Sequence, residues 1–282
     1  MQILGIFGHP ISHSLSAIMH KAAFEAVGLD KEYIYLSFDI HPDKLAQAVE
    51  GIRVLNFRGV NITIPHKEEV VAYLDEVDQQ ARLIGAVNVI KNDKGTLIGY
   101  NTDGWGFIKS LEEEAGLSPE NMKVVVLGAG GACRAVSASL AAEGAKEIVI
   151  INRTKSRAQS VTQMVKQYKI PVKSMDFSDK EVQQTIYDAE IIVNTTSVGM
   201  PPNTASPLEH YISCLHKGQL VCDIIYNPIE TTLLKDAREK GCRILAGLGM
   251  LLYQGVKAFN IWTGTDAPIE VMRKALWEKL YS

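Results

Sequence analysis

Short β-rich runs alternate with helical patterns along almost the whole chain of 282 residues. One set of such runs lies at 2–7, 33–38, 59–64, 86–90 and 96–100, and a second set lies at 123–127, 147–151, 171–175, 190–194 and 219–225. Because strands that alternate with helices build βαβ units, the sequence predicts an α/β fold with mostly parallel sheets.

The length suits two domains, at about 150 residues each. A helix-like segment ends at Gly116-Leu117-Ser118-Pro119, before the first strand of the second set. Glycine and proline are typical of such a break, so we expect the joint between the domains around 103–121. The chain closes with two helix-like segments, 248–262 and 267–280. The local pattern leaves open which domain these two segments join.

A glycine-rich turn follows the strand at 123–127 and opens an alanine-rich helix. Glycines let the backbone approach a pyrophosphate closely, and the N-terminus of a helix offers free N–H groups and the positive end of its dipole. The turn matches the dinucleotide fingerprint G-x-G-x-x-G except that Cys133 stands at the third glycine. A tight strand-to-helix turn without a ligand is the alternative. The residues of the turn are Gly128, Ala129, Gly130, Gly131 and Ala132.

A basic segment after the strand at 147–151 bears on the choice of dinucleotide. NAD-binding folds usually place Asp or Glu about 20 residues after the glycine turn, to accept a hydrogen bond from the ribose 2′-OH. Asn152 stands at this place, followed by Arg153 and Arg157. A carboxylate would repel a 2′-phosphate, whereas a guanidinium binds it by a charge-assisted, bidentate pair. The segment therefore favours NADP over NAD, with a solvated helix start as the alternative.

Four polar motifs lie at or beside strand ends of the first half, where open α/β sheets bind their ligands. Ser14 and Ser16 precede the first helix, where serine either caps the helix or helps to bind a carboxylate. Lys67 opens a helical segment after the strand at 59–64, and an ordinary exposed lysine is the alternative. For Asp103, helix capping is the alternative. The third and fourth motifs are Gly85-Ala86-Val87-Asn88 and Gly99-Tyr100-Asn101-Thr102-Asp103-Gly104.

Composition narrows the classes of function further. Apolar residues make up 46% and charged residues 22% of the chain, as in ordinary globular proteins. The net charge of −3 gives no general attraction to nucleic acid. With no signal sequence and no apolar run long enough to span a bilayer, we expect a soluble, cytoplasmic protein. The histidines and four cysteines show no zinc-like spacing and there is no GxSxG motif, so we expect reduced thiols, no catalytic metal and no serine hydrolase.

Eight motifs in order give the chain a specific resemblance to the shikimate dehydrogenase family, from the first strand to the last helices. The residue before the lysine, often phenylalanine in that family, is His66, and Cys133 is a small-residue exchange. Neither change removes a group that the chemistry requires. The motifs are SLS (14–16), NITIPHK (61–67), GAVN (85–88), NTDG (101–104), GAGGA (128–132), NRT (152–154), NTTSVGM (194–200) and the segment 247–254.

The resemblance implies NADP-linked, reversible reduction of 3-dehydroshikimate to shikimate in aromatic amino-acid biosynthesis. It implies a catalytic pair, Lys67 and Asp103. Because hydride transfer to a ketone leaves charge on an oxygen that needs a proton, we expect Lys67 to supply that proton or stabilise the alkoxide, and Asp103 to orient the lysine. It assigns the substrate carboxylate to Ser14 and Ser16. It assigns the ring and its hydroxyls to Thr63, Asn88, Tyr226 and Gln254.

The resemblance also implies how the cofactor is bound and how the domains divide. The turn at 128–132 would bind the pyrophosphate, and Asn152, Arg153, Thr154 and Arg157 the adenosine ribose and its phosphate. The closing helices would join the first domain, so we expect a substrate domain of 1–105 plus 248–282 and a Rossmann-like NADP domain of 106–247. The rest of the cofactor groove would be lined by Thr195, Ile224, Gly247 and Met250.

Two other functions stay open. The first is a quinate/shikimate dehydrogenase with relaxed substrate choice or NAD use. The second is a sensor that has lost catalysis, although such a protein would be expected to lack Lys67 or Asp103. We expect small-molecule partners only, shikimate and 3-dehydroshikimate, with no nucleic acid or membrane, and a monomer or homodimer.

Overall fold

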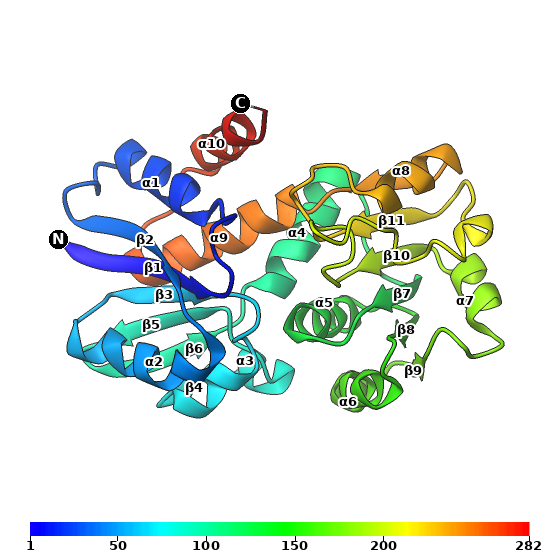
Figure 1. Cartoon of the computed structure of the whole chain (residues 1–282), viewed down its shortest axis with the longest axis horizontal. Helices are drawn as coiled ribbons and strands as arrows, with labels where there is room; N and C mark the ends of the chain where they lie inside the picture. Colours follow the sequence, from blue (N-terminus) through cyan, green and yellow to red (C-terminus); the bar gives the residue numbers. More distant parts are fainter. Residues whose placement is uncertain (282) are drawn as a thin grey trace. The chain divides into compact units, whose positions relative to one another are not determined.

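The computed structural model describes residues 1–281 and divides the chain into two compact units (Figure 1). Unit 1 comprises Met1–Gly106 and the chain from Leu252 onward, and unit 2 comprises Phe107–Leu251. Two helices, α4 (Asp103–Ala115) and α9 (Leu248–Thr263), contain the limits between the units. The boundaries expected from the sequence, 105/106 and 247/248, fall in or next to the same two helices.

A six-stranded sheet forms the centre of unit 1, with the order β2-β1-β3-β5-β6-β4. β5 pairs antiparallel with both neighbours, and the other pairs are parallel. A tight hairpin reverses the chain between β5 and β6, with Lys94 and Gly95 both at positive φ, as such turns require. The strands are β1 (Gln2–Gly8), β2 (Tyr33–Asp39), β3 (Gly59–Ile62), β4 (Glu76–Val77), β5 (Val89–Asp93) and β6 (Thr96–Tyr100).

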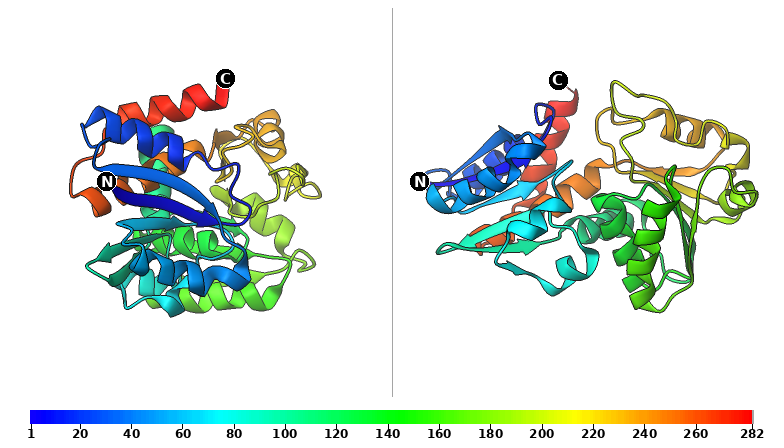
Figure 2. Two further views of the ribbon diagram at one scale, coloured as in Figure 1. Left: turned by 60° about the vertical axis from the view of Figure 1, so that its left-hand side comes forward. Right: turned by 60° about the horizontal axis from the view of Figure 1, so that its bottom comes forward.

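Helices cover both faces of this sheet, because successive strand residues point to opposite sides. On one face, side chains such as Phe7 and Ile62 share a core with Leu45 and Val70, contributed by α2 (Leu45–Val54) and the 3₁₀ helix η2 (Glu69–Tyr73), with α3 (Gln79–Ile84) beside them. The other face carries α1 (Ser16–Ala26) and α9, and α10 (Ile269–Tyr281) packs against α1 (Figure 2). The Trp262 indole N–H donates to the Ile90 carbonyl at 2.9 Å on that face.

Unit 2 contains a parallel sheet in the order β12-β11-β10-β7-β8-β9. This is the Rossmann order, in which the first strand lies at the centre and the strand order reverses beside it. Val124 and Val126 of β7 pack into one core and Val125 and Leu127 into the other. The strands are β7 (Lys123–Leu127), β8 (Glu147–Ile151), β9 (Val172–Met175), β10 (Ile191–Asn194), β11 (Leu220–Asp223) and β12 (Arg243–Leu245), and the helices are α5 (Gly131–Ala142), α6 (Lys155–Val165), α7 (Val182–Asp188) and α8 (Thr232–Glu239).

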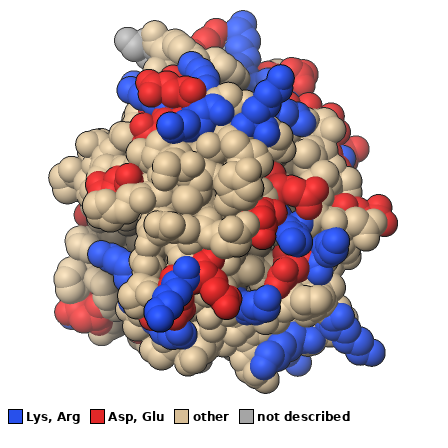
Figure 3. Space-filling model, turned by 90° about the vertical axis from the view of Figure 1, so that its right-hand side faces the viewer, with Lys and Arg blue, Asp and Glu red and all other residues tan. Residues whose placement is uncertain are grey.

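The predicted fold class, two α/β domains with mostly parallel strands, is confirmed. Sequence patterns missed β4 and β12, and β5 begins at Val89 because 85–88 form a turn and loop. The helical segment expected after Lys67 is the 3₁₀ helix η2. Within residues 1–281, none of the helices is both long enough and apolar enough to cross a membrane. On the face shown in Figure 3, basic and acidic side chains are interspersed, in keeping with the small net charge.

Candidate active site

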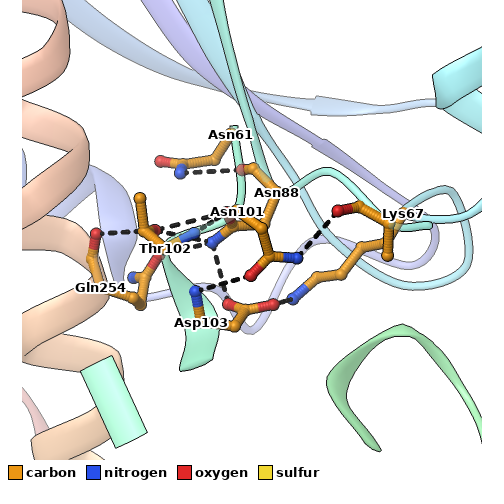
Figure 4. A network of polar contacts seen from close by, with 8 residues as sticks. Asn61, Lys67, Asn88, Asn101, Thr102, Asp103 and Gln254 are labelled. Carbon is orange, nitrogen blue, oxygen red and sulfur yellow. Dashed lines mark hydrogen bonds and ion pairs between the residues drawn. The ribbon is translucent and has the colours of Figure 1, made fainter. Parts of the chain in front are cut away.

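Lys67 and Asp103 form an enclosed ion pair in unit 1 (Figure 4). The Lys67 Nζ lies 2.5 Å from Asp103 Oδ2, and the side chains are only 16% and 5% exposed. Lys67 belongs to the turn after β3, and Asp103 is the first residue of α4. A charge-assisted hydrogen bond with little water around it is stronger and better oriented than a surface ion pair. The two residues predicted as the catalytic pair are therefore in direct contact.

Backbone contacts fix the turn that carries Lys67. The Val87 N–H donates to the Lys67 carbonyl at 2.8 Å. The neighbouring His66 side chain is buried, and its Nε2 lies 2.8 Å from the Ile40 carbonyl. A carbonyl only accepts, so Nε2 carries the hydrogen of this bond. His66, the departure from the family pattern, thus ties the turn to the segment after β2.

Asn101, and not Asp103, caps helix α4. The Asn101 Oδ1 accepts from the Asp103 N–H at 3.1 Å, and the Asn101 amide donates to the Ala86 carbonyl at 2.9 Å. The capping alternative for Asp103 is therefore wrong, because its carboxylate accepts from side chains and not from the first turn of the helix. This division of labour leaves both Asp103 oxygens for the candidate site.

Asn88 lies at the centre of the polar cluster drawn in Figure 4. Its Nδ2 donates to Asp103 Oδ1 and Thr102 Oγ1, both at 2.9 Å, while its Oδ1 accepts from the Thr102 N–H at 2.7 Å. Gln254, from α9, joins through its carbonyl, which accepts from Thr102 Oγ1 at 3.1 Å, and its Oε1 lies 3.4 Å from Asn88 Nδ2. Four predicted site residues therefore meet at one place: Lys67, Asn88, Asp103 and Gln254.

The antiparallel direction of β5 explains why Lys67, Asn88 and Asp103 meet. Lys67 follows the C-terminal end of β3, and Asp103 follows the C-terminal end of β6. Asn88 precedes the N-terminal end of β5, which lies between those two strands and runs against them. All three strand ends therefore open on the same edge of the sheet.

The structure adds Asn61, which the sequence reasoning quoted in a motif but did not assign to the site. Asn61 lies in β3 and is buried, and its Nδ2 donates to the Asn88 carbonyl at 3.2 Å. A polar residue inside an otherwise apolar strand was the available signal.

Three other predicted residues lie outside the contacts described for the cluster: Ser14 in the loop between β1 and α1, Ser16 at the first position of α1, and Thr63 directly after β3. The serines do not cap α1 by their side chains: Leu15 is the N-cap residue, and the Ser16 N–H donates weakly to Ser14 Oγ at 3.3 Å. Ser16 is nevertheless buried. Thr63, two residues after Asn61, packs its methyl group against Gly8, where a Cβ would collide with it.

In unit 2, the glycine turn has the geometry that a phosphate requires. Gly128 has φ +117°, and a Cβ there would lie 2.7 Å from Thr195 Oγ1, which itself donates to the Leu127 carbonyl at 2.6 Å. Gly130 is the N-cap residue of α5, and no side chain accepts a hydrogen bond from the first turn at this position. The first N–H groups of the helix are therefore available to an anion. Cys133 is buried and directs its Sγ to the Gly128 carbonyl at 3.1 Å. The residues present therefore fit a dinucleotide.

The basic segment after β8 is exposed. Asn152 Nδ2 donates to the Thr154 carbonyl at 2.9 Å and shapes the turn. Lys155 pairs with Asp179 at 2.9 Å, whereas Arg153 and Arg157 have no ion-pair partner among residues 1–281. Two guanidinium groups on one turn of a helix start are suited to a phosphate.

The remaining predicted cofactor residues surround one small hollow of unit 2. Ile224, Gly247 and Met250 line it together with Asp223, and half-buried Tyr226 follows on the same loop. A larger hollow of about 400 Å³ is lined by residues such as Lys123 and Glu147, and none of its lining residues is a predicted site residue.

Asp223 was missed by the sequence reasoning. It is 1% exposed and accepts from Asn194 Nδ2 at 3.1 Å, the Ile225 N–H at 3.0 Å and Thr231 Oγ1 at 2.8 Å. Burial nevertheless raises the pKa of its carboxyl to about 6. These bonds tie together the loops after β10 and β11, which carry Thr195 and Ile224.

A unit with an enclosed lysine–aspartate pair and a second, Rossmann-type unit with a phosphate turn are the parts of a two-domain, nicotinamide-dependent dehydrogenase. Family comparisons agree with this class. Residues 6–90 match the shikimate dehydrogenase substrate-binding domain, 111–235 match the shikimate/quinate 5-dehydrogenase family, and 247–276 match the shikimate 5′-dehydrogenase C-terminal domain. The chain belongs to the shikimate dehydrogenase family, and the resemblance inferred from the motifs is confirmed.

Several relatives match over nearly the full length. The NADP⁺ shikimate dehydrogenase of Methanopyrus kandleri is 46% identical over 280 residues, which cover 99% of this chain and 96% of the relative. The shikimate 5-dehydrogenase of Thermus thermophilus, solved with NADP(H) and shikimate, is 34% identical with a TM-score of 0.86 and covers 99% of each chain. The quinate dehydrogenase of Corynebacterium glutamicum, solved with NAD, is 33% identical with a TM-score of 0.88, covering 98% of this chain and 99% of that one.

Proposed function

We propose that the protein catalyses the reversible, NADPH-dependent reduction of 3-dehydroshikimate to shikimate, in the biosynthesis of aromatic amino acids. The observation that carries this proposal is the Lys67–Asp103 pair, 2.5 Å apart and held by Asn88. The names of the full-length relatives support the same substrate and cofactor.

In this reaction, the side chains of the protein hold and deliver the proton that the substrate oxygen requires. NADPH, when bound, would supply the hydride. As the ketone is reduced, negative charge develops on its oxygen, and Lys67 Nζ donates a hydrogen bond or a proton to it. Asp103 Oδ2 keeps Nζ in position, and Asn88 keeps the carboxylate from rotating because it holds Oδ1 at 2.9 Å. In the oxidation of shikimate, the proton returns along the same contact.

Substrate binding follows from the surrounding polar groups. Ser14 and Ser16 would donate to the carboxylate, while Thr63, Asn88, Tyr226 and Gln254 would contact the ring and its hydroxyls. Hydrogen bonds to a charged group are the strong ones, so the carboxylate is the main anchor of the substrate.

Cofactor binding is divided between two turns of unit 2. The turn Gly128 to Ala132 would bind the pyrophosphate through backbone N–H groups. Asn152, Arg153, Thr154 and Arg157 would bind the adenosine ribose and the 2′-phosphate. Thr195, Ile224, Gly247 and Met250 would line the remaining groove.

The role of Lys67 is tested by Lys67→Ala. Loss of a positioned acid lowers turnover by about 10²–10⁴-fold, so kcat should fall by orders of magnitude while KM for shikimate changes much less. Lys21→Ala, at a side chain 77% exposed on α1, is the matched control and should keep full activity. A Lys67→Ala enzyme with an unchanged kcat would refute this role.

Cofactor choice is tested by Arg153→Asp. The change replaces attraction with repulsion at the 2′-phosphate, so binding of NADPH should weaken far more than binding of NADH. Lys180→Asp, another exposed cation of unit 2, makes the same change in net charge and serves as the control. Equal losses for the two cofactors would contradict the assignment.

A second candidate is a quinate/shikimate dehydrogenase with relaxed substrate or cofactor choice, and the NAD-bound quinate dehydrogenase relative favours it. Steady-state assays with shikimate and quinate, each with NADP and NAD, separate the two. Turnover of shikimate with NADP alone supports the first candidate. Turnover of quinate, or turnover with NAD, supports the second, and no turnover in any combination points to a sensor.

We further propose a cytoplasmic location and a monomeric or homodimeric state. Cell fractionation tests the first, and light scattering of the eluted protein distinguishes one copy from two or from a larger assembly.

A further inference from the structure

Tyr35, on the edge strand β2, reaches a residue of the candidate site from two strands away. Parallel register aligns Tyr35 with Leu4, and Ile6 with Asn61, so these side chains share one face of the sheet. The Tyr35 hydroxyl donates to Asn61 Oδ1 at 2.6 Å, across strand β1. This contact links the edge of the sheet to the polar cluster around Asn88.

An aromatic cluster holds the Tyr35 ring in place. The ring stacks on His20 at 4.6 Å and lies 6.1 Å from the Trp262 ring. His20 is fully buried, and its ring nitrogens have no hydrogen-bond partner among residues 1–281. Burial lowers the pKa of His20 to about 3, so it is a neutral stacking surface at physiological pH. Tyr35 is therefore held rigidly, with only its hydroxyl left for polar contacts.

The direction of each hydrogen bond can be assigned. A phenol has one hydrogen, and Asn61 Oδ1 accepts only, so that hydrogen goes to Asn61. Asn61 Oδ1 is thereby directed toward Tyr35, and Nδ2 toward the Asn88 carbonyl at 3.2 Å. In this orientation the Asn61 N–H donors, and not its oxygen, face Asn88 and the polar cluster around it.

We infer that Tyr35 is a positioning residue for substrate binding, because its hydroxyl fixes the orientation of the Asn61 amide next to Asn88. The inference rests on the proposed function, since it concerns the affinity for shikimate. Without the hydroxyl, the Asn61 oxygen loses its hydrogen-bond donor, and the longer bond from Nδ2 to the Asn88 carbonyl, 3.2 Å, holds the amide in this orientation alone. A flipped amide would direct an oxygen at the Asn88 carbonyl and repel it.

The test is Tyr35→Phe, which removes the hydroxyl and keeps the stacked ring. One ordered hydrogen bond corresponds to about a tenfold change in binding, so KM for shikimate should rise about tenfold. The KM for NADP⁺ and kcat should change less than about twofold. Tyr33→Phe is the matched control, because Tyr33 lies on the same strand and stacks on Phe24, yet its hydroxyl has no described partner within residues 1–281.

A double-mutant cycle shows whether Tyr35 acts through Asn61. Asn61→Ala should raise KM for shikimate, and Tyr35→Phe added to it should have no further effect on KM. Additive effects, an unchanged KM in Tyr35→Phe, or equal losses for shikimate and NADP⁺ would each overturn the inference. Turnover by the wild type distinguishes a failure of the positioning role from a failure of the proposed function. If wild type turns shikimate over and Tyr35→Phe behaves like wild type, only the positioning role fails. If wild type does not turn shikimate over, the proposed function fails, and this inference fails with it.

Discussion

The buried carboxyl of Asp223 makes the stability of the protein depend on pH in an unusual direction. Asp223 is neutral in the folded protein over a wider pH range than in the unfolded chain, because burial raises its pKa from 3.8 to about 6. The perturbation to make is Asp223→Asn, which has the same shape and no charge at any pH. The Asn Oδ1 can still accept from Asn194 and from the Ile225 N–H, and its NH₂ can donate to Thr231 Oγ1.

The magnitude follows from the shift in pKa. At about 1.4 kcal/mol per pKa unit, a rise from 3.8 to about 6 corresponds to about 3 kcal/mol. Between these values the folded protein binds a proton that the unfolded chain has released, so stability falls as the pH rises. The contribution is complete below pH 3.8 and is lost as the pH passes about 6. Wild type should therefore lose stability relative to Asp223→Asn over this window.

The assay is urea unfolding of both proteins, followed by circular dichroism between pH 4.5 and 7.5. Over that range the free energy of unfolding of wild type, minus that of Asp223→Asn, should fall by about 2 kcal/mol. Asp188→Asn, at an exposed residue of α7, controls for the loss of a carboxyl as such. A difference between wild type and Asp223→Asn that is flat, or that grows with pH, would refute the reasoning.

Two further predictions concern the folding of unit 1. Gly59→Ala should destabilise the protein by about 1–3 kcal/mol, because the new Cβ would collide with the Trp262 indole. Calorimetry should therefore show a lower Tm for this variant. Gly51→Ala, with open space around the new Cβ in α2, should instead raise the Tm. Asp78→Ala should cost about 1 kcal/mol, because Asp78 caps α3 and accepts from the Gln80 N–H at 3.0 Å; chemical unfolding measures the loss.

The fold of unit 2 was readable from its sequence because its four central strands, β7, β8, β10 and β11, are buried on both faces. The run of β7, Lys123–Leu127, is apolar at four successive positions, and a parallel sheet covered by helices on both sides requires that pattern. The strands β4 and β12 were missed because segments as short as Glu76–Val77 and Arg243–Leu245 have too few residues to show a period. Their pairing is decided by neighbouring strands and not by their own composition.

The supporting residues of the site were harder to find. Tyr35 is 26 positions from Asn61 in the sequence, and the residues around it are those of an ordinary edge strand. Asp223 was missed because nothing in the local sequence indicates that Asn194 and Thr231 converge on its carboxylate. Contacts of this kind depend on strand order and register, which a sequence pattern does not specify.

The direction of β5 decides whether unit 1 has a polar cluster at all. The sequence reasoning placed Lys67, Asn88 and Asp103 at or beside strand ends, but a common edge follows only if β5 runs against β3 and β6. Val89–Asp93 contains five residues, so a parallel β5 would carry Asn88 about 17 Å away, to the opposite edge, at about 3.3 Å per residue. Asp103 Oδ1 would then lose the amide that holds it, and Lys67 would face a carboxylate free to rotate. The tight turn at Lys94-Gly95, remote from the chemistry, is therefore what brings the amide to the ion pair.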